Sequence, residues 1–589
     1  MLRTSPSRIS YLSLLGLFLG MVTGGAAWVL IKLIAVITNV TLFGEIAFEL
    51  PSMNDLEPSP RIVLVAVIGA LAIALLARWS PIIKGHGIPE AMESVLHRQS
   101  RVAPRTAIAK PLSSAIAIGT GGPFGAEGPI IVTGGSLGSL LGQLLHVTPS
   151  ERKILLACGA AGGMAATFGA PIASIVLATE LLLFEFSTRA FIPTAVSAAV
   201  AGGIHTALFG DGPLFTVPDH GFAGLADLPL FVPLGILCGL LAVVISKGLF
   251  LFEAGFRRLP VPEFWHPVIG AVGFGVVGMA VPQVLGVGYD QIDAVLAGTM
   301  TLGALTTLGG AKLLAWWIAL GSGTSGGTLA PVLLVSGAFG AVIGELTMAV
   351  VPDSGLSTGA FALVAMAATF GAATRATLTS IVFVFELTRD FDAILPLILA
   401  SVLADLVGAW LLPHTLMTEK LHRRGYRVQT DLQADISGNT LVGEVMTTDV
   451  VTIAADATAE DAAHIVGTTG HNVLPVIDQN GHLTGVVARS DLMSGDGLLV
   501  GPIATLAQVD VVTVTRDTTV GEASRIMMAE GVDHLPVVEQ GTLLVGMCTR
   551  TDILKASRLA LAAESPEAGW LSRRRRDPGP NQEGDVGPQ

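Results

Sequence analysis

The sequence predicts an all-α polytopic membrane domain of two duplicated halves with broken helices, followed by a duplicated α/β domain. Three observations predict this fold class. Hydrophobic residues make up 51% of the 589 residues and charged residues only 13%, with a mean hydropathy of +0.68, whereas roughly a quarter of the residues in a soluble protein are charged. One sequence repeat runs through the apolar part of the chain, and a second runs through the less apolar C-terminal part.

The apolar segments extend over about 9–37, 62–76, 230–252 and 394–412, with shorter ones between them. A helix needs about 20 apolar residues to cross the hydrocarbon core, and several segments are shorter or interrupted by Gly and Pro. Such broken helices line cavities in transporters and channels. No small-residue cleavage site closes a short apolar segment near the N-terminus, so we expect the first helix to be retained.

Basic residues indicate the orientation of the membrane domain. Arg3 and Arg8 precede the first apolar segment, and the basic stretch 420–424 follows the last one. Positive charge is enriched on the cytoplasmic side of membrane proteins. We therefore expect the N-terminus and the C-terminal domain to be cytoplasmic.

Three motifs of the form Gly-x-x-x-Pro organise the membrane domain: box 1 at 85–89, box 2 at 125–129 and box 3 at 327–331. Their glycines permit a tight turn, and proline suits the first turn of the helix that follows. A helix start presents unpaired N–H groups and the positive end of its dipole, so three starts together would bind an anion without a full positive charge. Glu127 in box 2 is a carboxylate that would compete with this anion, or alternatively a simple cap of its own helix.

A repeat relates the two halves of the membrane domain. Residues 164–170 recur unchanged at 366–372, and the same spacing pairs box 2 with box 3. The halves, about 60–210 and 229–412, are therefore duplicates. We expect them to be inverted, because that arrangement would aim both helix starts at one point from opposite sides.

From about residue 11 to 424, these ordered boxes over two related halves resemble the CLC chloride channels and exchangers. The resemblance implies the CLC fold over residues 1–427, a homodimer with a separate pathway in each subunit, and a bacterial-type inner membrane. It also implies that Glu127 is the gate, which withdraws when it is protonated or displaced. The anion-binding positions that it implies are His86, Gly87, Ile88, Gly128, Thr328, Leu329 and Met417.

The sequence departs from the family pattern at four positions, three inside the boxes and one after the last apolar segment. His86 replaces a serine that faces the anion, although imidazole can still donate a hydrogen bond or instead cap the turn. Leu329 replaces a phenylalanine, Met417 replaces a pore tyrosine, and Ala126 replaces a basic residue before the gate. These differences leave the identity of the anion open.

Leu181 bears on the mode of transport. Many family exchangers carry two adjacent glutamates here, the second of which passes protons from the inside, whereas this chain has Glu180 followed by Leu181. Glu180 aligns with Glu386, which indicates a structural role such as accepting a backbone hydrogen bond. We therefore favour a gated chloride channel of the voltage-gated CLC type. The alternative is a proton-coupled antiporter of chloride or another anion, such as fluoride or nitrate.

Other functional classes fit the sequence less well. A membrane metalloprotease would need a His-Glu-x-x-His motif, and a cation transporter would need several intramembrane carboxylates, whereas Glu127 stands alone among glycines. We predict a protein that is not an enzyme, needs no cofactor for transport, contacts membrane lipid and binds no nucleic acid. The three cysteines lack metal-ligand spacing and are expected to be buried.

The C-terminal part resembles a tandem pair of CBS domains, at 441–493 and 500–556 after a linker at 428–440. Residues 449–453 recur as 510–514, and 485–491 recur as 546–552 at the same spacing. The resemblance implies an adenine nucleotide, ATP, ADP or AMP, between the units, although the pair could instead serve only for packing and dimerisation. The nucleotide-binding residues that it implies are Val512, Thr549 and Asp552, all in the second unit. The first unit has Ala488 in the hydroxyl position, and the tail 571–589 is predicted to be disordered.

Overall fold

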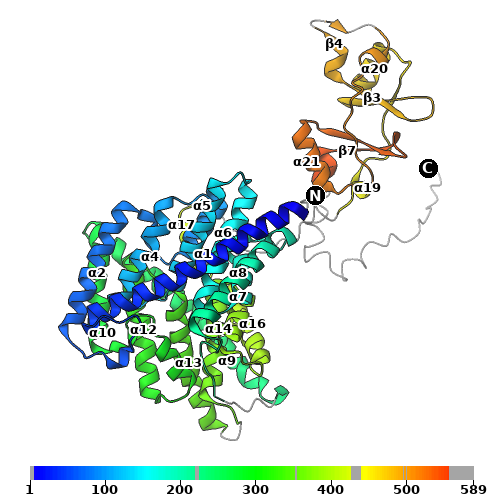
Figure 1. The fold of residues 1–589 in the computed structure, drawn as a ribbon. Helices are drawn as coiled ribbons and strands as arrows, with labels where there is room; N and C mark the ends of the chain where they lie inside the picture. The colour runs from blue at the N-terminus through cyan, green and yellow to red at the C-terminus, as the bar shows by residue number, and fades with distance from the viewer. Residues whose placement is uncertain are drawn as a thin grey trace, which may run out of the picture. The chain divides into compact units, whose positions relative to one another are not determined.

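The computed structural model describes residues 6–218, 224–351, 355–425, 440–494, 497–498 and 501–555. The described residues form two compact units, a helical one over residues 6–425 and an α/β one within residues 440–555 (Figure 1). Arg3, nearly all of the predicted linker 428–440 and the predicted tail 571–589 lie outside the described residues.

The helices of the first half are α1 Pro6–Thr38, continued by the π-helical turn η1 Asn39–Phe43, then α2 Pro60–Trp79, α3 Ile88–His97, α4 Pro104–Gly119, α5 Glu127–Leu144, α6 Pro149–Phe168, α7 Pro171–Leu177, continued by η4 Ala178–Leu183, and α8 Thr188–Phe209. In this half, box 1 opens α3 and box 2 opens α5, as the sequence predicts. The short 3-10 turns η2 Met53–Asp55 and η3 Pro81–Ile83 lie in the connections.

The second half repeats this order. Its helices are α9 Leu228–Arg257, α10 His266–Ala280, α11 Tyr289–Leu296, α12 Leu302–Gly321, α13 Leu329–Val350, α14 Thr358–Thr374, α15 Thr377–Thr388 and α16 Ile394–Leu411, followed by the short α17 Glu419–Arg423. Eight helices in the described part of the chain are long and apolar enough to cross a membrane. α3, α7, α11 and α15 are shorter, as expected for broken helices.

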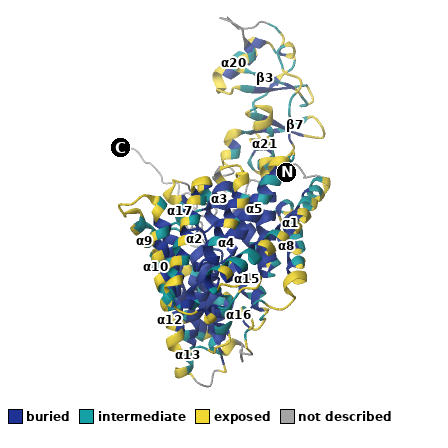
Figure 2. Cartoon of the chain, turned by 60° about the vertical axis from the view of Figure 1, so that its left-hand side comes forward, coloured by how far each residue is buried: buried dark blue, intermediate teal, exposed yellow. Residues whose placement is uncertain are grey.

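The two halves are inverted relative to each other, as predicted. α5 and α13 occupy equivalent positions in the repeat, and they begin side by side, where the Gly327 N–H donates to the Gly125 carbonyl at 3.1 Å. From this point α5 and α13 extend to opposite ends of the helical unit (Figures 1 and 2). Two helix starts therefore point at one place from opposite sides.

Glu180 and Glu386 each accept hydrogen bonds at the start of a helix in the opposite half. Glu386 in α15 accepts hydrogen bonds from the N–H groups of Ile172 and Ala173 at the start of α7, at 3.0 and 2.6 Å. Glu180, in the turn that continues α7, accepts from the N–H and hydroxyl of Thr379 at the start of α15, at 3.1 and 2.6 Å. The structural role predicted for Glu180 is confirmed.

One continuous hydrophobic core joins both halves, and Figure 2 shows buried residues along the middle of the helical unit. The outer helices α1, α2, α9 and α16 expose apolar side chains, including Leu14, Leu64, Leu251 and Trp410. An apolar exterior around an apolar core suits a lipid environment, because lipid tails cannot form hydrogen bonds with polar groups on the protein surface.

The α/β unit contains two similar halves, each with a helix and an antiparallel strand pair. Their elements are α19 Val442–Val445, β1 Ile453–Ala454, α20 Ala459–Thr469, β2 Val473–Ile477, β3 Leu483–Ala488, η9 Arg489–Leu492, β4 Met493–Ser494, β5 Gly497–Leu498, η10 Ile503–Thr505, α21 Val520–Glu530, β6 His534–Glu539 and β7 Leu543–Thr549. The first sheet has the order β1-β2-β3, with β1 parallel and β3 antiparallel to β2, and β6 pairs antiparallel with β7.

The first residues of each half pack into the other half. Val442 and Met446, at the start of the first half, lie in the core of the second. Ile503, at the start of the second half, lies in the core of the first. The stretch through which the chain enters this unit is therefore part of the second half's core.

We expect Glu386→Ala to lower the free energy of unfolding by about 1–3 kcal/mol, because it leaves two N–H groups at the start of α7 without their acceptor. The measurement is the midpoint of thermal unfolding of the detergent-solubilised protein. Glu45→Ala, at an exposed position, is the control. Equal midpoints for the two variants would contradict the capping role.

Candidate anion site

Box 3 lies against both other boxes in the interior of the helical unit. The Gly85 N–H of box 1 donates to the Thr324 carbonyl at 3.3 Å, and Gly85 pairs with Ser325 as a parallel bridge just before box 3. Gly125 of box 2 pairs with Gly327 of box 3. These backbone contacts bring the starts of α3, α5 and α13 to one place, as the sequence predicts.

Gly128 allows box 2 to touch box 1. A Cβ atom at Gly128 would overlap the His86 carbonyl oxygen, and one at Gly87 would lie 2.7 Å from the Gly128 carbonyl oxygen. The two backbones are thus in direct contact, which a larger residue would prevent. Because the three helix starts are this close, the positive ends of their dipoles act on the same small region.

Glu127 points into this region and not toward lipid. It is the first residue of α5, and its side chain is 1% exposed. The carboxylate interacts with the Ala330 N–H in the first turn of α13 and accepts a hydrogen bond from the Tyr289 hydroxyl at 3.3 Å. Its Oε2 atom has no hydrogen-bond partner among the described residues. The carboxylate therefore lies where an anion would be bound by the same helix starts.

Other predicted anion-binding residues are also buried at the helix starts. His86 is 5% exposed, and its Nδ1 lacks a partner within the described ranges. Ile88 opens α3, Thr328 precedes α13 and Leu329 opens it, and all three are buried. Met417 is fully buried in the main core, and its N–H donates to Thr415 Oγ1 at 3.2 Å. An anion contact by Met417 stays a prediction.

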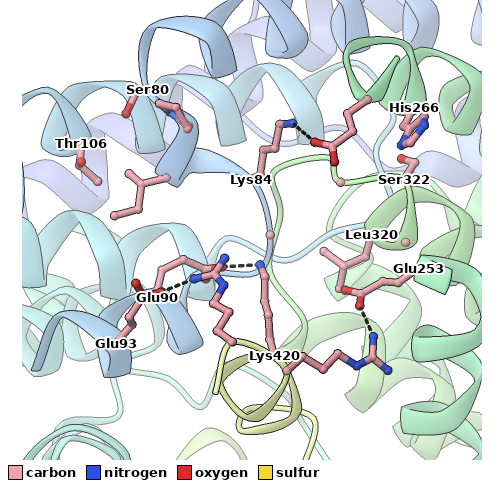
Figure 3. Close-up of a pocket in the computed structure, with 18 of the residues that line it drawn as sticks. Ser80, Lys84, Glu90, Glu93, Thr106, Glu253, His266, Leu320, Ser322 and Lys420 are labelled. Atoms are coloured by element: carbon pink, nitrogen blue, oxygen red, sulfur yellow. Dashed lines mark hydrogen bonds and ion pairs between the residues drawn. The ribbon is translucent and has the colours of Figure 1, made fainter. Parts of the chain in front are cut away.

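The backbone donor of Gly87 is already paired. Its N–H donates to Glu90 Oε2 at 2.9 Å, and Glu90 Oε1 binds Lys420 of α17 at 2.5 Å. This ion pair lies at the edge of a cavity of about 820 Å³ beside box 1 (Figure 3). Arg424, directly after α17, pairs similarly with Glu93 of α3. An anion can use the Gly87 N–H only if Glu90 releases it, which the sequence did not predict.

Two buried lysines donate hydrogen bonds to backbone carbonyls in the turns before α3 and α11. Lys110 donates to the carbonyls of Ile83 and Gly85 before box 1, both at 2.8 Å. Lys312 donates to the carbonyls of Val284 and Gly286 at 2.9 and 3.0 Å. Both lysines are fully buried. Peptide dipoles are therefore not the only polar groups that shape the site, contrary to the expectation from the boxes alone.

The sequence contained a signal for these missed residues. Lys110 and Lys312 are separated by the spacing that relates box 2 to box 3, and 286–289 follow box 1 at nearly that spacing. Gly286 and Gly288 match the two glycines of box 1, and Tyr289 then matches Ile88. Residues 286–289 lack the proline that defines the boxes, so the Gly-x-x-x-Pro pattern does not include them.

In the α/β unit, Thr549 and Asp552 bind each other. The Thr549 N–H and hydroxyl donate to Asp552 Oδ2 at 3.0 and 2.7 Å, and Lys555 Nζ donates to Oδ1 at 3.2 Å. Val512 packs against the core of the same half. In the first half, the Ala488 N–H donates to Asp491 Oδ2 at 2.9 Å, and the Ser490 hydroxyl donates to Asp491 Oδ1 at 3.3 Å. The structure thus brings Thr549 and Asp552 together, and both Asp552 carboxylate oxygens already accept hydrogen bonds within this half.

The cysteines behave as predicted. Cys158, Cys238 and Cys548 are buried and unpaired. In the described part of the chain, no group of three or more His, Cys, Asp or Glu residues could hold a metal ion.

Comparison with known proteins gives matches in both units. A family model described as "Voltage gated chloride channel" matches residues 68–409, more than half of the chain, and a CBS domain model matches 442–496 and 503–559. The "H(+)/Cl(-) exchange transporter ClcA" of Vibrio campbellii is 32% identical over 61% of this chain and 79% of its own length. The "Chloride channel protein CLC-f" of Arabidopsis thaliana is 26% identical over 82% of this chain and 71% of its own length.

Solved structures share the fold. That of a slow cyanobacterial Cl−/H+ antiporter is 24% identical, with a TM-score of 0.65 over 70% of this chain and 97% of its own. That of a eukaryotic CLC transporter is 20% identical, with a TM-score of 0.58 over 92% of this chain and 97% of its own. These likenesses confirm the predicted fold of the membrane unit.

We expect Gly128→Ala to weaken chloride binding at least roughly tenfold, because the new Cβ separates box 1 from box 2 and moves the helix starts apart. Isothermal titration of the purified protein with chloride measures the affinity. Gly203→Ala in α8, where a Cβ meets nothing within 4 Å, is the control. Unchanged affinity in a normally folded Gly128→Ala protein would show that this backbone contact does not form the site.

Proposed function

Because this chain belongs to the voltage-gated chloride channel family, we propose that it is an integral membrane antiporter that exchanges chloride for protons. The sequence analysis favoured a passive channel, with proton-coupled exchange as the alternative. The relatives support the alternative better, since ClcA, which is 32% identical, is named an H(+)/Cl(-) exchange transporter. Fluoride or nitrate would fit the same type of site, so chloride is proposed from the relatives.

The observation that carries the proposal is the buried carboxylate of Glu127 among converging helix starts. When charged, it takes the backbone donors that an anion needs. When it binds a proton it becomes neutral, and its attraction to those donors falls. An anion can then replace it. One group thus alternates between excluding the anion and carrying a proton, which links the movements of the two ions.

A gated channel is the second candidate, and Leu181 favours it. Leu181 is 3% exposed in an apolar core, where the family resemblance places the carboxylate that passes protons from the inside. An exchanger built on this chain needs another inner path for protons. A channel would need none, because Glu127 would act only as a gate.

We also propose the assembly, orientation and nucleotide site that the sequence analysis led us to expect. The protein is a homodimer in a bacterial-type inner membrane, contacts lipid, has its N-terminus and CBS pair in the cytoplasm, and is a transporter and not an enzyme. The CBS pair binds one adenine nucleotide at Thr549 and Asp552 of the second unit. The hydroxyl of Thr549, absent at Ala488 of the first unit, supports this assignment to one side.

Proton coupling can be tested in liposomes that contain the purified protein. We expect an imposed chloride gradient to drive protons uphill, and Glu127→Gln to abolish this proton movement while chloride still passes, because an amide cannot carry the proton. A pH-sensitive dye and a chloride electrode measure the two fluxes. Chloride flux without proton movement in the unmodified protein would instead establish the channel.

Nucleotide binding can be tested on the full chain by isothermal titration with AMP, ADP and ATP. We expect one nucleotide per chain, and Asp552→Asn to weaken binding roughly tenfold or more, because a charged acceptor is lost. Asp491→Asn in the equivalent position of the first unit is the matched control and should bind normally. Equal losses in both variants would contradict a single site.

A further inference from the structure

We propose that the hydroxyl of Tyr289 is a direct ligand of the transported anion. In this proposal, the O–H that now donates to the Glu127 carboxylate donates to the anion once Glu127 has withdrawn. The inference rests on the proposed function of the Glu127 site and adds to it a side-chain ligand from the second half.

The geometry places the hydroxyl within hydrogen-bond distance of the carboxylate that the anion would replace. Tyr289 Oη lies 3.3 Å from Glu127 Oε1, and the anion is expected where that carboxylate now lies. Tyr289 opens α11 directly after Gly288, whose φ of 82° turns the chain at this point. The side chain is partly buried. An anion that replaces the carboxylate therefore meets an O–H donor already directed at it.

The aromatic ring is held in place by residues from separate parts of the chain. Phe168 at the end of α6 and Phe215 in the connection after α8 contact it edge to face, with centroids 6.3 and 5.9 Å away. Phe215 is 2% exposed, and its N–H donates to the Leu387 carbonyl at 3.1 Å. The ring is thus fixed by packing, and the hydroxyl cannot simply follow Glu127 when the carboxylate leaves.

A hydroxyl left without an acceptor in such surroundings is unfavourable. A halide accepts hydrogen bonds as a carboxylate does, so its arrival would restore the lost bond. The internal repeat supports this assignment independently, because Tyr289 occupies the position of Ile88 in box 1. Two equivalent turns therefore reach the site from opposite halves, and only the second supplies a hydroxyl at this position.

The binding test uses the full protein with Glu127→Ala, in which no carboxylate competes with the anion. We expect Tyr289→Phe in this background to weaken chloride binding roughly tenfold, as measured by isothermal titration, since a hydrogen bond to a charged partner is lost while the ring stays. Tyr11→Phe in α1, beside Arg8 and outside the site, is the matched control and should keep its affinity.

A second measurement reports contact independently of affinity. The chain has 3 tyrosines, so 3-fluorotyrosine labelling gives a fluorine spectrum simple enough to assign with the two Tyr→Phe variants. We expect chloride to shift the Tyr289 resonance of the Glu127→Ala protein with the titrated affinity and to leave the Tyr11 resonance unchanged.

Chloride binding of equal affinity with and without the Tyr289 hydroxyl, together with an unshifted Tyr289 resonance, would overturn the proposal and leave the Glu127 site intact. If neither the unmodified protein nor the Glu127→Ala protein binds or transports chloride, the proposed function is wrong, and the role of Tyr289 falls with it.

Discussion

The contact between the backbones of the three boxes is the feature on which the rest of this structure depends. Gly125 pairs with Gly327, and Gly128 lies against the His86 carbonyl, so helix starts from both halves reach one point. This approach is possible because glycine leaves no side chain between the backbones. Inversion of the halves makes it useful, since it aims the dipoles of α5 and α13 at the same place from opposite ends of the unit.

A site made in this way attracts negative charge without exposing a cation to lipid. Glu127 already uses it, and its burial is tolerated because peptide N–H groups and the Tyr289 hydroxyl face the carboxylate. Lys110 and Lys312 lie behind the turns and donate to backbone carbonyls, and so hold the peptide groups that form the site. Intramembrane ionisable groups are costly and are retained where they serve function.

Ion pairs connect the C-terminal end of the membrane unit to the helix that box 1 opens. Lys420 of α17 pairs with Glu90 of α3, and Arg424, directly after α17, pairs with Glu93. Glu90 in turn binds the Gly87 N–H at the start of α3. Beyond α17 the chain reaches the α/β unit, where its entering segment packs into the core of the second CBS half. The half that carries Thr549 and Asp552 is thus the one that holds this entering segment.

Hydropathy and repeat spacing determined the membrane class and the duplication of both units. Local motifs determined the helix starts at the boxes, the position of Glu127 at one of them, and the CBS pair. Each of these features depends on short stretches of neighbouring residues. Tertiary structure alone decided that Glu90 occupies the Gly87 N–H and that Tyr289 reaches Glu127. Such contacts join segments far apart in the chain, and no local pattern specifies which side chain meets which backbone group.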